Sequence, residues 1–255
     1  MNKRQEEILN ILAAEKTLGT AELANRLGVS IATIRRDISA LTEKKLIDKH
    51  YGGISVKSTD FNIQNYVSCN IRSQNLHKEK IKIGKKALEF TRDDSVIALD
   101  IGTTTSELAK LLHSRKNLII ITNSLFIASN LAQNTNHQIC LIGGTVSSNE
   151  VITYGHYASE FLSHFAYIDQ FFISADAISD QIGITETHDF QADIKSQIAR
   201  LAKETILLAD HTKFNKAARF KSIDLSNVDR MVTDSEPPED VLDSMRKRGI
   251  ECYTV

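Results

Sequence analysis

Residues 77–255 contain short apolar runs that alternate with helical patterns, and this alternation restricts the fold more than any other feature of the chain. The runs are Val96–Leu99, Leu118–Thr122, Gln138–Ile142, Gln170–Ser174, Thr205–Ala209, Arg230–Thr233 and Glu251–Val255. The helical patterns are Lys78–Phe90, Thr104–His113, Leu125–Gln133, Tyr157–His164, Ile194–Lys203 and Glu239–Lys247. Short apolar strands separated by helices are typical of a parallel sheet buried on both faces. We therefore expect a doubly wound, mostly parallel α/β domain.

Polar clusters follow five of the predicted strands. They are Asp100–Thr105, Thr122–Ser124, Gly143–Gly144, Asp176 and Asp210–Lys213. Parallel strands end at one common edge of their sheet, and open α/β sheets bind ligands there, so the clusters predict a single site. Each cluster alone is equally compatible with an ordinary loop, and the prediction depends on the coincidence of all five.

The stretch Ile97–Lys110 is predicted to form a strand, a tight turn and the start of a helix. Backbone N–H groups and hydroxyls at such a turn suit a phosphate. The residues assigned to this cradle are Gly102, Thr103, Thr104 and Thr105. Asp100 and Asp176 suit sugar hydroxyls, because carboxylate oxygens accept hydrogen bonds with directionality.

Other polar residues of the predicted site keep two interpretations. Asn123 and Ser124 either offer donors to the ligand or only cap the helix that follows. Lys195 either brings positive charge to the ligand or pairs with Asp189, Asp193 or Glu186. Lys213 is a second basic candidate, and Asp210 is placed to brace it.

Residues 1–57 show three helical patterns followed by a hairpin pattern. Lys3–Ala14 forms the first helix, Thr20 is predicted to cap the second, and Gly28 ends it. Ser30 caps the third helix, whose core stripe is Ile34, Ile38 and Leu41. An extended segment then turns back at Gly52–Gly53. This order predicts a winged helix-turn-helix domain.

The face that this third helix leaves outside the core carries small and basic residues. Small side chains at a helix N-terminus allow a close approach to base edges, and Arg35 and Arg36 suit guanine or phosphate. Residues 1–57 contain ten Lys and Arg against seven Asp and Glu, although a solvated basic face has the same composition. The predicted DNA contacts are Thr20, Ser30, Ile31, Ala32, Thr33, Arg35, Arg36, Lys49, His50 and Tyr51.

The segment ELANRLGVSIATIRRDISALTEKKLIDKHYGGI closely resembles the N-terminal signature of DeoR-family transcriptional regulators. The matching elements are ELA, LGVS, TIRRD and the GG of the wing. The departures are Ile38 in place of the usual leucine and Tyr51 in the wing, where HGGA is typical. The resemblance implies that the chain binds double-stranded operator DNA as a homo-oligomer, either a dimer or a tetramer.

The remainder resembles the DeoR-family sensor domain through DIGTTTSELAKLL, TNS, LIGG, YIDQFFISADAIS and LLADHTKF, in the family's order. This resemblance implies a domain related to ribose-5-phosphate isomerase that binds a phosphorylated sugar effector. It also implies a repressor of sugar-metabolism genes. Ser174 and Ala177 replace two family glycines and add bulk beside Asp176. The implied boundaries are 1–57 for the DNA-binding domain, 58–76 for the linker and 77–255 for the sensor.

An active sugar-phosphate isomerase fused to a DNA-binding domain is the alternative. The isomerase motif DGAD carries two aspartates, and Ile173 occupies the position of the first. The glycine-rich lysine motif is also absent, although Glu186 resembles a candidate base. A module that has lost its ligand is a second alternative, against which the retained GTTT and Asp176 argue. We therefore predict binding without turnover, and assign no catalytic residue, metal or cofactor.

The cysteines and the N-terminus indicate the compartment. Cys69, Cys140 and Cys252 are far apart and form neither a CxxC motif nor a His/Cys cluster. The N-terminal segment lacks an apolar signal core, and no run approaches the length of a membrane span. The sequence therefore predicts a cytoplasmic protein without a membrane partner.

Overall fold

The computed structural model describes residues 3–15, 17–43, 46–50, 53–56, 75–147 and 150–255. Contacts divide the chain into an N-terminal unit that extends to Asn75 and a larger C-terminal unit that begins at Leu76. Of the predicted linker, residues 58–76, all but the last two lie outside the described residues. Along these described ranges, no helix combines the length and apolar character needed to cross a bilayer.

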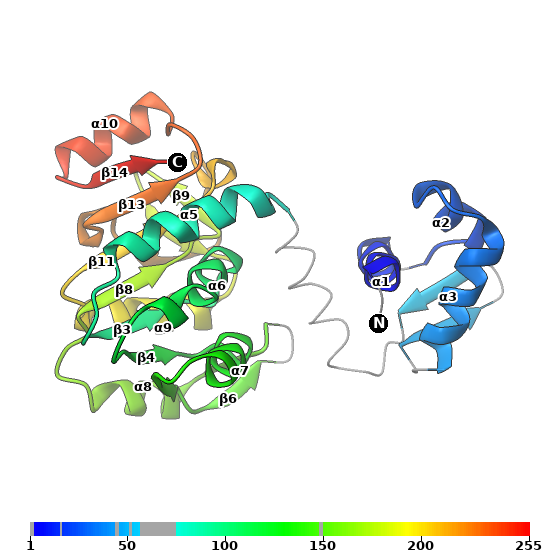
Figure 1. The fold of residues 1–255 in the computed structure, drawn as a ribbon. Coiled ribbons are helices and arrows are strands. Elements are labelled where there is room, and N and C mark those ends of the chain that lie inside the picture. Colours follow the sequence, from blue (N-terminus) through cyan, green and yellow to red (C-terminus); the bar gives the residue numbers. More distant parts are fainter. Residues whose placement is uncertain (1–2, 16, 44–45, 51–52, 57–74, 148–149) are drawn as a thin grey trace. The chain divides into compact units, whose positions relative to one another are not determined.

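The described residues of the N-terminal unit form three helices and a two-stranded hairpin, as the pattern predicts (Figure 1). The elements are α1 (Lys3–Glu15), α2 (Thr20–Arg26), α3 (Ile31–Glu43), β1 (Ile47–His50) and β2 (Gly53–Val56). Strands β1 and β2 are antiparallel. Apolar residues of all five elements form one core, which includes Ile8, Leu12, Leu23, Ile34, Ile38, Leu41, Ile47 and Ile54.

Local capping explains where α2 and α3 begin and end. The Ser30 hydroxyl accepts a hydrogen bond from the Thr33 N–H at 3.2 Å, so Ser30 caps α3 as predicted. Gly28 follows α2 with a φ of 62°, a left-handed conformation that favours glycine. The predicted cap at Thr20 is wrong, because Gly19 occupies the N-cap position and Thr20 is already helical.

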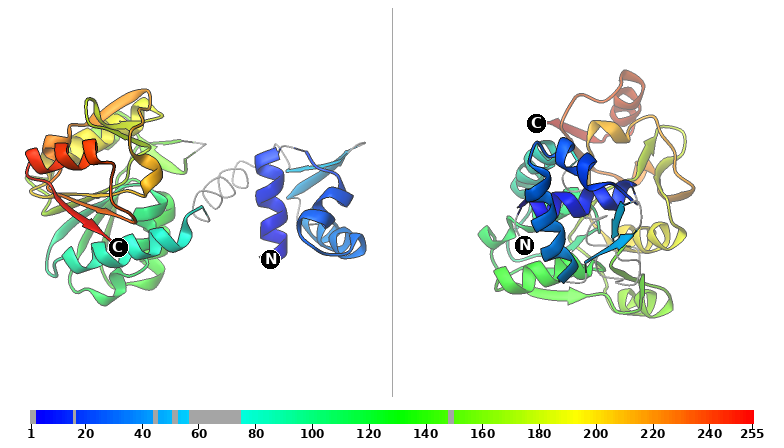
Figure 2. Two further views of the ribbon diagram at one scale, coloured as in Figure 1. Left: turned by 90° about the horizontal axis from the view of Figure 1, so that it is seen from above. Right: turned by 90° about the vertical axis from the view of Figure 1, so that its right-hand side faces the viewer.

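The C-terminal unit is built on one parallel sheet of seven strands. The strands are β3 (Val96–Leu99), β4 (Ile119–Thr122), β5 (Gln138–Leu141), β8 (Gln170–Ile173), β11 (Thr205–Leu208), β13 (Arg230–Thr233) and β14 (Glu251–Thr254). Their order is β14-β13-β11-β8-β3-β4-β5, and β14 carries the C-terminus at one edge (Figure 1, Figure 2). All seven predicted runs therefore belong to the same sheet.

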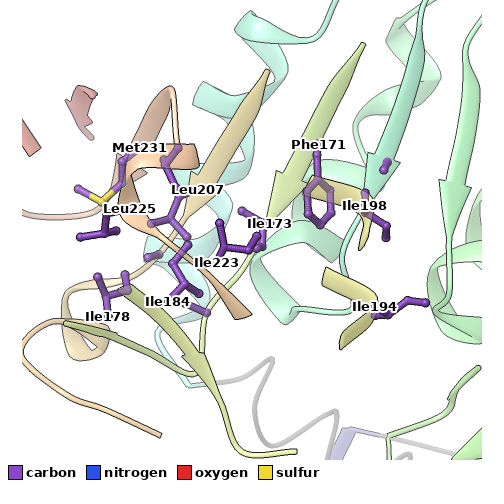
Figure 3. Packing of buried hydrophobic residues seen from close by; sticks show 14 of the residues in the cluster. Phe171, Ile173, Ile178, Ile184, Ile194, Ile198, Leu207, Ile223, Leu225 and Met231 are labelled. Carbon is purple, nitrogen blue, oxygen red and sulfur yellow. The ribbon is translucent and has the colours of Figure 1, made fainter. Parts of the chain in front are cut away.

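Successive residues of the central strands point to opposite faces and enter two separate apolar clusters. Phe171 and Ile173 belong to one cluster, and Phe172 between them belongs to the other. On the first face the strands pack against Ile194 and Ile198 of α9 (Figure 3). The helices are α5 (His77–Phe90), α6 (Thr103–Ala109), α7 (Leu125–Asn134), α8 (His156–Ser163), α9 (Asp189–Leu201) and α10 (Glu239–Lys247).

The structure adds short elements that the apolar pattern does not predict. Strands β6 (Thr145–Ser147) and β7 (Ile152–Tyr154) form a hairpin. Strands β9 (Ala177–Ser179), β10 (Gly183–Glu186) and β12 (Phe220–Ile223) form a small antiparallel sheet. These strands contain polar residues, as in TVS of β6 and FKSI of β12, so no continuous apolar run marks them. Helix α9 begins at Asp189 rather than at the predicted Ile194. The predicted helix Thr104–His113 is divided into α6 and a 3₁₀ turn at Leu112–Ser114.

Candidate functional sites

The outer face of α3 carries the side chains predicted to contact DNA. Ser30, Ile31, Ala32, Arg35 and Arg36 are exposed, and 45% of Ile31 is accessible. Thr33 is half-buried, and its hydroxyl lies 2.8 Å from that of Ser30. Exposure of a large apolar side chain such as Ile31 to water is energetically unfavourable, and burial against a partner would remove this cost. This face therefore combines basic, small and apolar groups around the start of one helix.

A hollow of about 500 Å³ lies between α3 and the hairpin, and it joins three groups that are separate in the sequence. Arg35 lines it from α3, Lys49 and His50 line it from β1, and Thr20 lines it from the start of α2. Among the described residues that line it, none is acidic, so the hollow suits an anion such as a DNA phosphate. The His50 Nε2 atom lies 2.7 Å from the Ser55 hydroxyl. Tyr51, the remaining predicted contact, lies outside the described residues.

Asp37 follows the two arginines, and the motif alone assigns it no role. Its carboxylate is buried against α1, where Oδ2 lies 2.5 Å from the Arg4 Nε atom. Oδ1 accepts a hydrogen bond of 3.1 Å from the Gln5 side-chain amide. The sequence contains a signal for this contact, since Asp37 interrupts the apolar stripe between Ile34 and Leu41. A charged residue on a core face requires a partner.

In the C-terminal unit, the predicted clusters follow β3, β4, β5, β8 and β11, which are consecutive neighbours in the sheet. The chain moves from β3 outward to β4 and β5, and then from β8 outward in the other direction. The sheet therefore reverses its order between β3 and β8, which is where open α/β sheets have a crevice for ligands. Asp100 follows β3, and Ser174 and Asp176 follow β8.

Lys195 of α9 is buried at this reversal point, with 2% of its surface accessible. Its ammonium lies 3.0 Å from Asp100 Oδ2 and 2.8 Å from Glu186 Oε1, and it donates to the Ser174 carbonyl at 2.9 Å. Of the two interpretations for Lys195, the structure shows the ion pair, and its partner is Glu186 from the predicted set. The second partner, Asp100, was not among the predicted ones. Asp100 Oδ2 also accepts hydrogen bonds from the Ser174 N–H and hydroxyl. This oxygen is therefore occupied within the protein.

Burial sets the protonation of this cluster. It raises the pKa of the Glu186 carboxyl to about 7, and the charge of Asp100 acts in the same direction, against the opposing charge of Lys195. Burial alone lowers the pKa of the Lys195 ammonium, but Asp100 and Glu186 reverse this and raise it. The charge of Glu186 therefore changes near neutral pH.

The predicted phosphate cradle has a different internal arrangement from the one expected. The Thr105 hydroxyl donates to the carbonyls of Asp100 and Gly102, both at 2.7 Å, so it faces the backbone of its own turn. Thr104 is also buried, and Thr103 is half-buried. A Cβ atom at Gly102 would overlap the Ser174 hydroxyl. The cradle thus offers the backbone N–H groups at the start of α6 rather than three free hydroxyls.

The clusters after β4 and β5 have structural partners. The Ser124 hydroxyl accepts a hydrogen bond from the Ile127 N–H at 3.2 Å and caps α7. The Asn123 amide donates to the Thr153 carbonyl at 3.1 Å, and both residues are buried. Gly143 and Gly144 are exposed, and Gly144 has a φ of 137° at its close approach to Tyr154. Of the two interpretations for Asn123 and Ser124, the capping and bracing contacts are the ones present.

The last two clusters lie around Asp176. Its carboxylate accepts a hydrogen bond from the Thr187 N–H at 2.9 Å. Burial acts to raise the pKa of Asp176, but the hydroxyl and N–H of Thr187 and the charges of Lys195 and Lys213 outweigh it and lower that pKa. Asp210 accepts a hydrogen bond from the Thr212 N–H at 3.0 Å, which caps the 3₁₀ turn that carries Lys213.

A hollow of about 480 Å³ adjoins Asp176. Thr187, Lys216 and Arg219 contribute to its lining, so cations and a carboxylate are combined there. Such a surface suits a ligand that has both hydroxyl and anionic groups. No cluster of three or more His, Cys, Asp or Glu side chains with the geometry of a metal site occurs among the residues with described coordinates.

Comparisons with known proteins agree with this arrangement. The model of the DeoR-like helix-turn-helix domain matches residues 4–60, and that of the DeoR C terminal sensor domain matches residues 75–235. An uncharacterized HTH-type transcriptional regulator from Haemophilus influenzae is 31% identical over 99% of this chain and 97% of its own length. The glycerol-3-phosphate regulon repressor of Escherichia coli is 29% identical over 98% of this chain and 97% of its own.

The folds and the two matched domains define a helix-turn-helix transcriptional regulator with a C-terminal sensor domain, and not an enzyme. Among solved structures, this chain matches a D-ribose-5-phosphate isomerase in complex with phospho-erythronic acid. The match covers 54% of this chain and 54% of the isomerase chain, at 20% sequence identity and a TM-score of 0.42. The chain belongs to the DeoR family, and its helix-turn-helix domain binds operator DNA. The predicted family, fold class and lack of enzymatic function are thereby confirmed.

Proposed function

We propose that this regulator represses sugar-metabolism genes and that a phosphorylated sugar, bound at the end of β3 and β8, modulates its binding to the operator. The reversal of strand order between β3 and β8 is the observation that carries the proposal, because Asp100, the start of α6 and the buried ammonium of Lys195 lie at the ends of these two strands. The repressor with the related sequence is named for the glycerol-3-phosphate regulon, and a phosphorylated effector is consistent with that name.

In this proposal the effector phosphate contacts the N–H groups at the start of α6 and the Lys213 ammonium. Asp176 accepts hydrogen bonds from sugar hydroxyls, which suits a carboxylate that stays ionised. Asp100 and Lys195 act on the ligand indirectly, because their charged atoms are paired with each other. The Ser174 side chain occupies the space beside Gly102 and narrows the crevice.

On the DNA side, α3 enters the major groove with Arg35 and Arg36, and Lys49 and His50 contact the phosphate backbone. The chain acts in the cytoplasm as a homo-oligomer, with domain boundaries at 1–57 and 77–255. The effector changes operator affinity only through its different affinity for the two arrangements of the DNA-binding domains.

Thermal unfolding with a panel of sugar phosphates tests the effector site. At least one member should raise the melting temperature of the wild type, and Lys213→Ala should lose that increase. Lys116→Ala is the matched control, since Lys116 is exposed and precedes β4, at the amino ends of the strands and away from the proposed site at their carboxyl ends. Equal stabilisation of Lys213→Ala and the wild type would refute the site.

The role of α3 in DNA binding is tested with an operator, which is first identified by selecting the DNA fragments that the wild type binds. The affinity of each variant for this operator is then measured. Arg35→Ala and Arg36→Ala should each weaken binding at a fixed salt concentration. Arg26→Ala removes another exposed charge, from α2, where Arg26 pairs with Glu15 and Glu22, and should leave affinity unchanged. Unchanged affinity in both α3 variants would exclude this helix as the DNA-reading element.

A further inference from the structure

The buried carboxylate of Asp37 joins the helix proposed to read DNA to the first helix of the chain. Arg4 and Gln5 are successive residues of α1, and each contacts a different oxygen of this carboxylate. The residues are separated by more than thirty positions in the sequence, so the contact depends on the tertiary fold. We call Arg4, Gln5 and Asp37 the Asp37 clamp.

Contact through both oxygens fixes more than the distance between α1 and α3. A single hydrogen bond permits rotation about its own axis, whereas two donors on two oxygens define the plane of the carboxylate. Since the Asp37 side chain has only two rotatable bonds, each with few preferred rotamers, a fixed carboxylate plane also restricts the rotation of α3 about its axis.

This rotation decides where the arginines point. An α-helix turns by about 100° per residue, so Arg36 lies about 100° and Arg35 about 200° from Asp37 around α3. When Asp37 faces α1, Arg35 is directed to the opposite side, where it lines the hollow shared with Lys49 and His50. A modest rotation of α3 would remove Arg35 from this hollow.

The apolar seam between α1 and α3 does not provide the same restraint. Ile8 and Leu12 of α1 share a core with Ile34, Ile38 and Leu41 of α3. Hydrophobic burial is nondirectional, and aliphatic side chains accommodate small rotations by changing rotamer. Among the described residues the clamp adds a directional contact between the two helices, in which Asp37 and Gln5 are buried and 37% of the Arg4 side chain is accessible.

We propose that the Asp37 clamp is a positioning device that sets the rotation of α3 and thereby the sequence specificity of operator binding. Arg4, Gln5 and Asp37 act through Arg35 and Arg36 and do not themselves contact DNA. The inference rests on the proposal that α3 reads the operator. Loss of the clamp should therefore reduce discrimination between operator and other DNA more than it reduces binding to DNA in general.

The double variant Arg4→Met with Asp37→Leu tests this in the full chain. It replaces a partly buried ion pair with apolar side chains, and such an exchange often preserves stability where the pair is buried. Affinities for the selected operator and for unrelated DNA of equal length are measured over a range of salt concentrations. We expect the ratio of the two affinities to fall at least tenfold, with general binding and its salt dependence unchanged, because the phosphate contacts remain.

Ile38→Val is the matched control, since it removes one methyl group from the adjacent buried position and leaves the clamp intact. It should lower the melting temperature without changing the affinity ratio. Gln5→Met combined with Asp37→Asn serves if the first double variant does not fold, because it weakens both contacts without introducing a large side chain.

A ratio that stays within twofold of the wild type in a folded clamp variant would overturn the proposal. A decrease of about one in the salt slope on Arg4→Met alone would also overturn it, since Arg4 would then contact a phosphate. If Arg35→Ala and Arg36→Ala both leave operator binding unchanged as well, the proposed role of α3 fails. If Arg35→Ala weakens operator binding while the clamp variants keep their specificity, only the clamp fails.

Discussion

Glu186→Gln tests the energetic cost of the charged cluster beneath the sensor crevice. The folded protein holds the pKa of Glu186 at about 7, against an ordinary value of 4.5, mainly through burial. Between these two values the folded chain keeps a proton that the unfolded chain has lost, so stability falls as the pH rises. The full difference corresponds to about 3 kcal/mol, and about 2.5 kcal/mol of it falls between pH 5 and pH 8.

The Gln variant has the same shape, and its side-chain oxygen still accepts hydrogen bonds from Lys195 and Ser222. Because glutamine does not ionise, the variant escapes this pH-dependent loss. Urea unfolding of both proteins, followed by tyrosine fluorescence since the chain has no tryptophan, gives the stability difference at each pH. The advantage of Glu186→Gln over the wild type should grow by about 2.5 kcal/mol between pH 5 and pH 8.

Glu251→Gln is the control for this measurement. A hydrogen bond from Tyr253 and the neighbouring Arg230 lower the pKa of Glu251, so its contribution changes only in more acidic solution. Its stability difference from the wild type should be constant between pH 5 and pH 8. A difference for Glu186→Gln that is equally constant, or that moves in favour of the wild type as the pH rises, would refute the assignment of a costly buried carboxylate.

Three further predictions concern single contacts. Gly102→Ala should lower the melting temperature because its methyl group would overlap Ser174, and Ser174→Gly should restore it in the double variant. Ser30→Ala should destabilise the N-terminal unit by about 1 kcal/mol in urea unfolding through loss of the α3 cap; an unchanged midpoint would contradict the capping role. Asp176→Asn should abolish the binding of sugar phosphates, as measured by calorimetric titration, while the chain stays folded. Retained binding would exclude Asp176 as a ligand contact.

The sequence predicts the sheet well because its signal is local. Each strand of the parallel sheet appears as its own apolar run, and the alternation of Phe171, Phe172 and Ile173 between two cores needs no distant information. The same is true of Ser30, whose hydroxyl caps a helix that begins at the next residue. Capping, turn chemistry and periodicity act over a few residues, so one sequence suffices to recognise them.

The charged contacts depend on distant residues, and the sequence does not specify their partners. Asp189, Asp193 and Glu186 are near Lys195 in the chain, yet its second partner is Asp100. Likewise, nothing near Asp37 indicates Arg4 as its partner. The Thr105 hydroxyl, expected at the ligand, turns to backbone carbonyls instead because the helix N-terminus places it there. Positions of groups at the site were therefore predictable, while their hydrogen-bond partners were not.

The burial of Lys195 also has a consequence for the order in which the chain becomes functional. During synthesis Asp100 leaves the ribosome well before Lys195, since chains grow from the N-terminus. Until α9 docks, Asp100 lacks the cation that neutralises it in the finished fold, and the crevice beside β3 has no opposite wall. If the effector binds as proposed, its site is therefore complete only after both halves of the sheet have assembled, so that a response to the ligand requires completed folding.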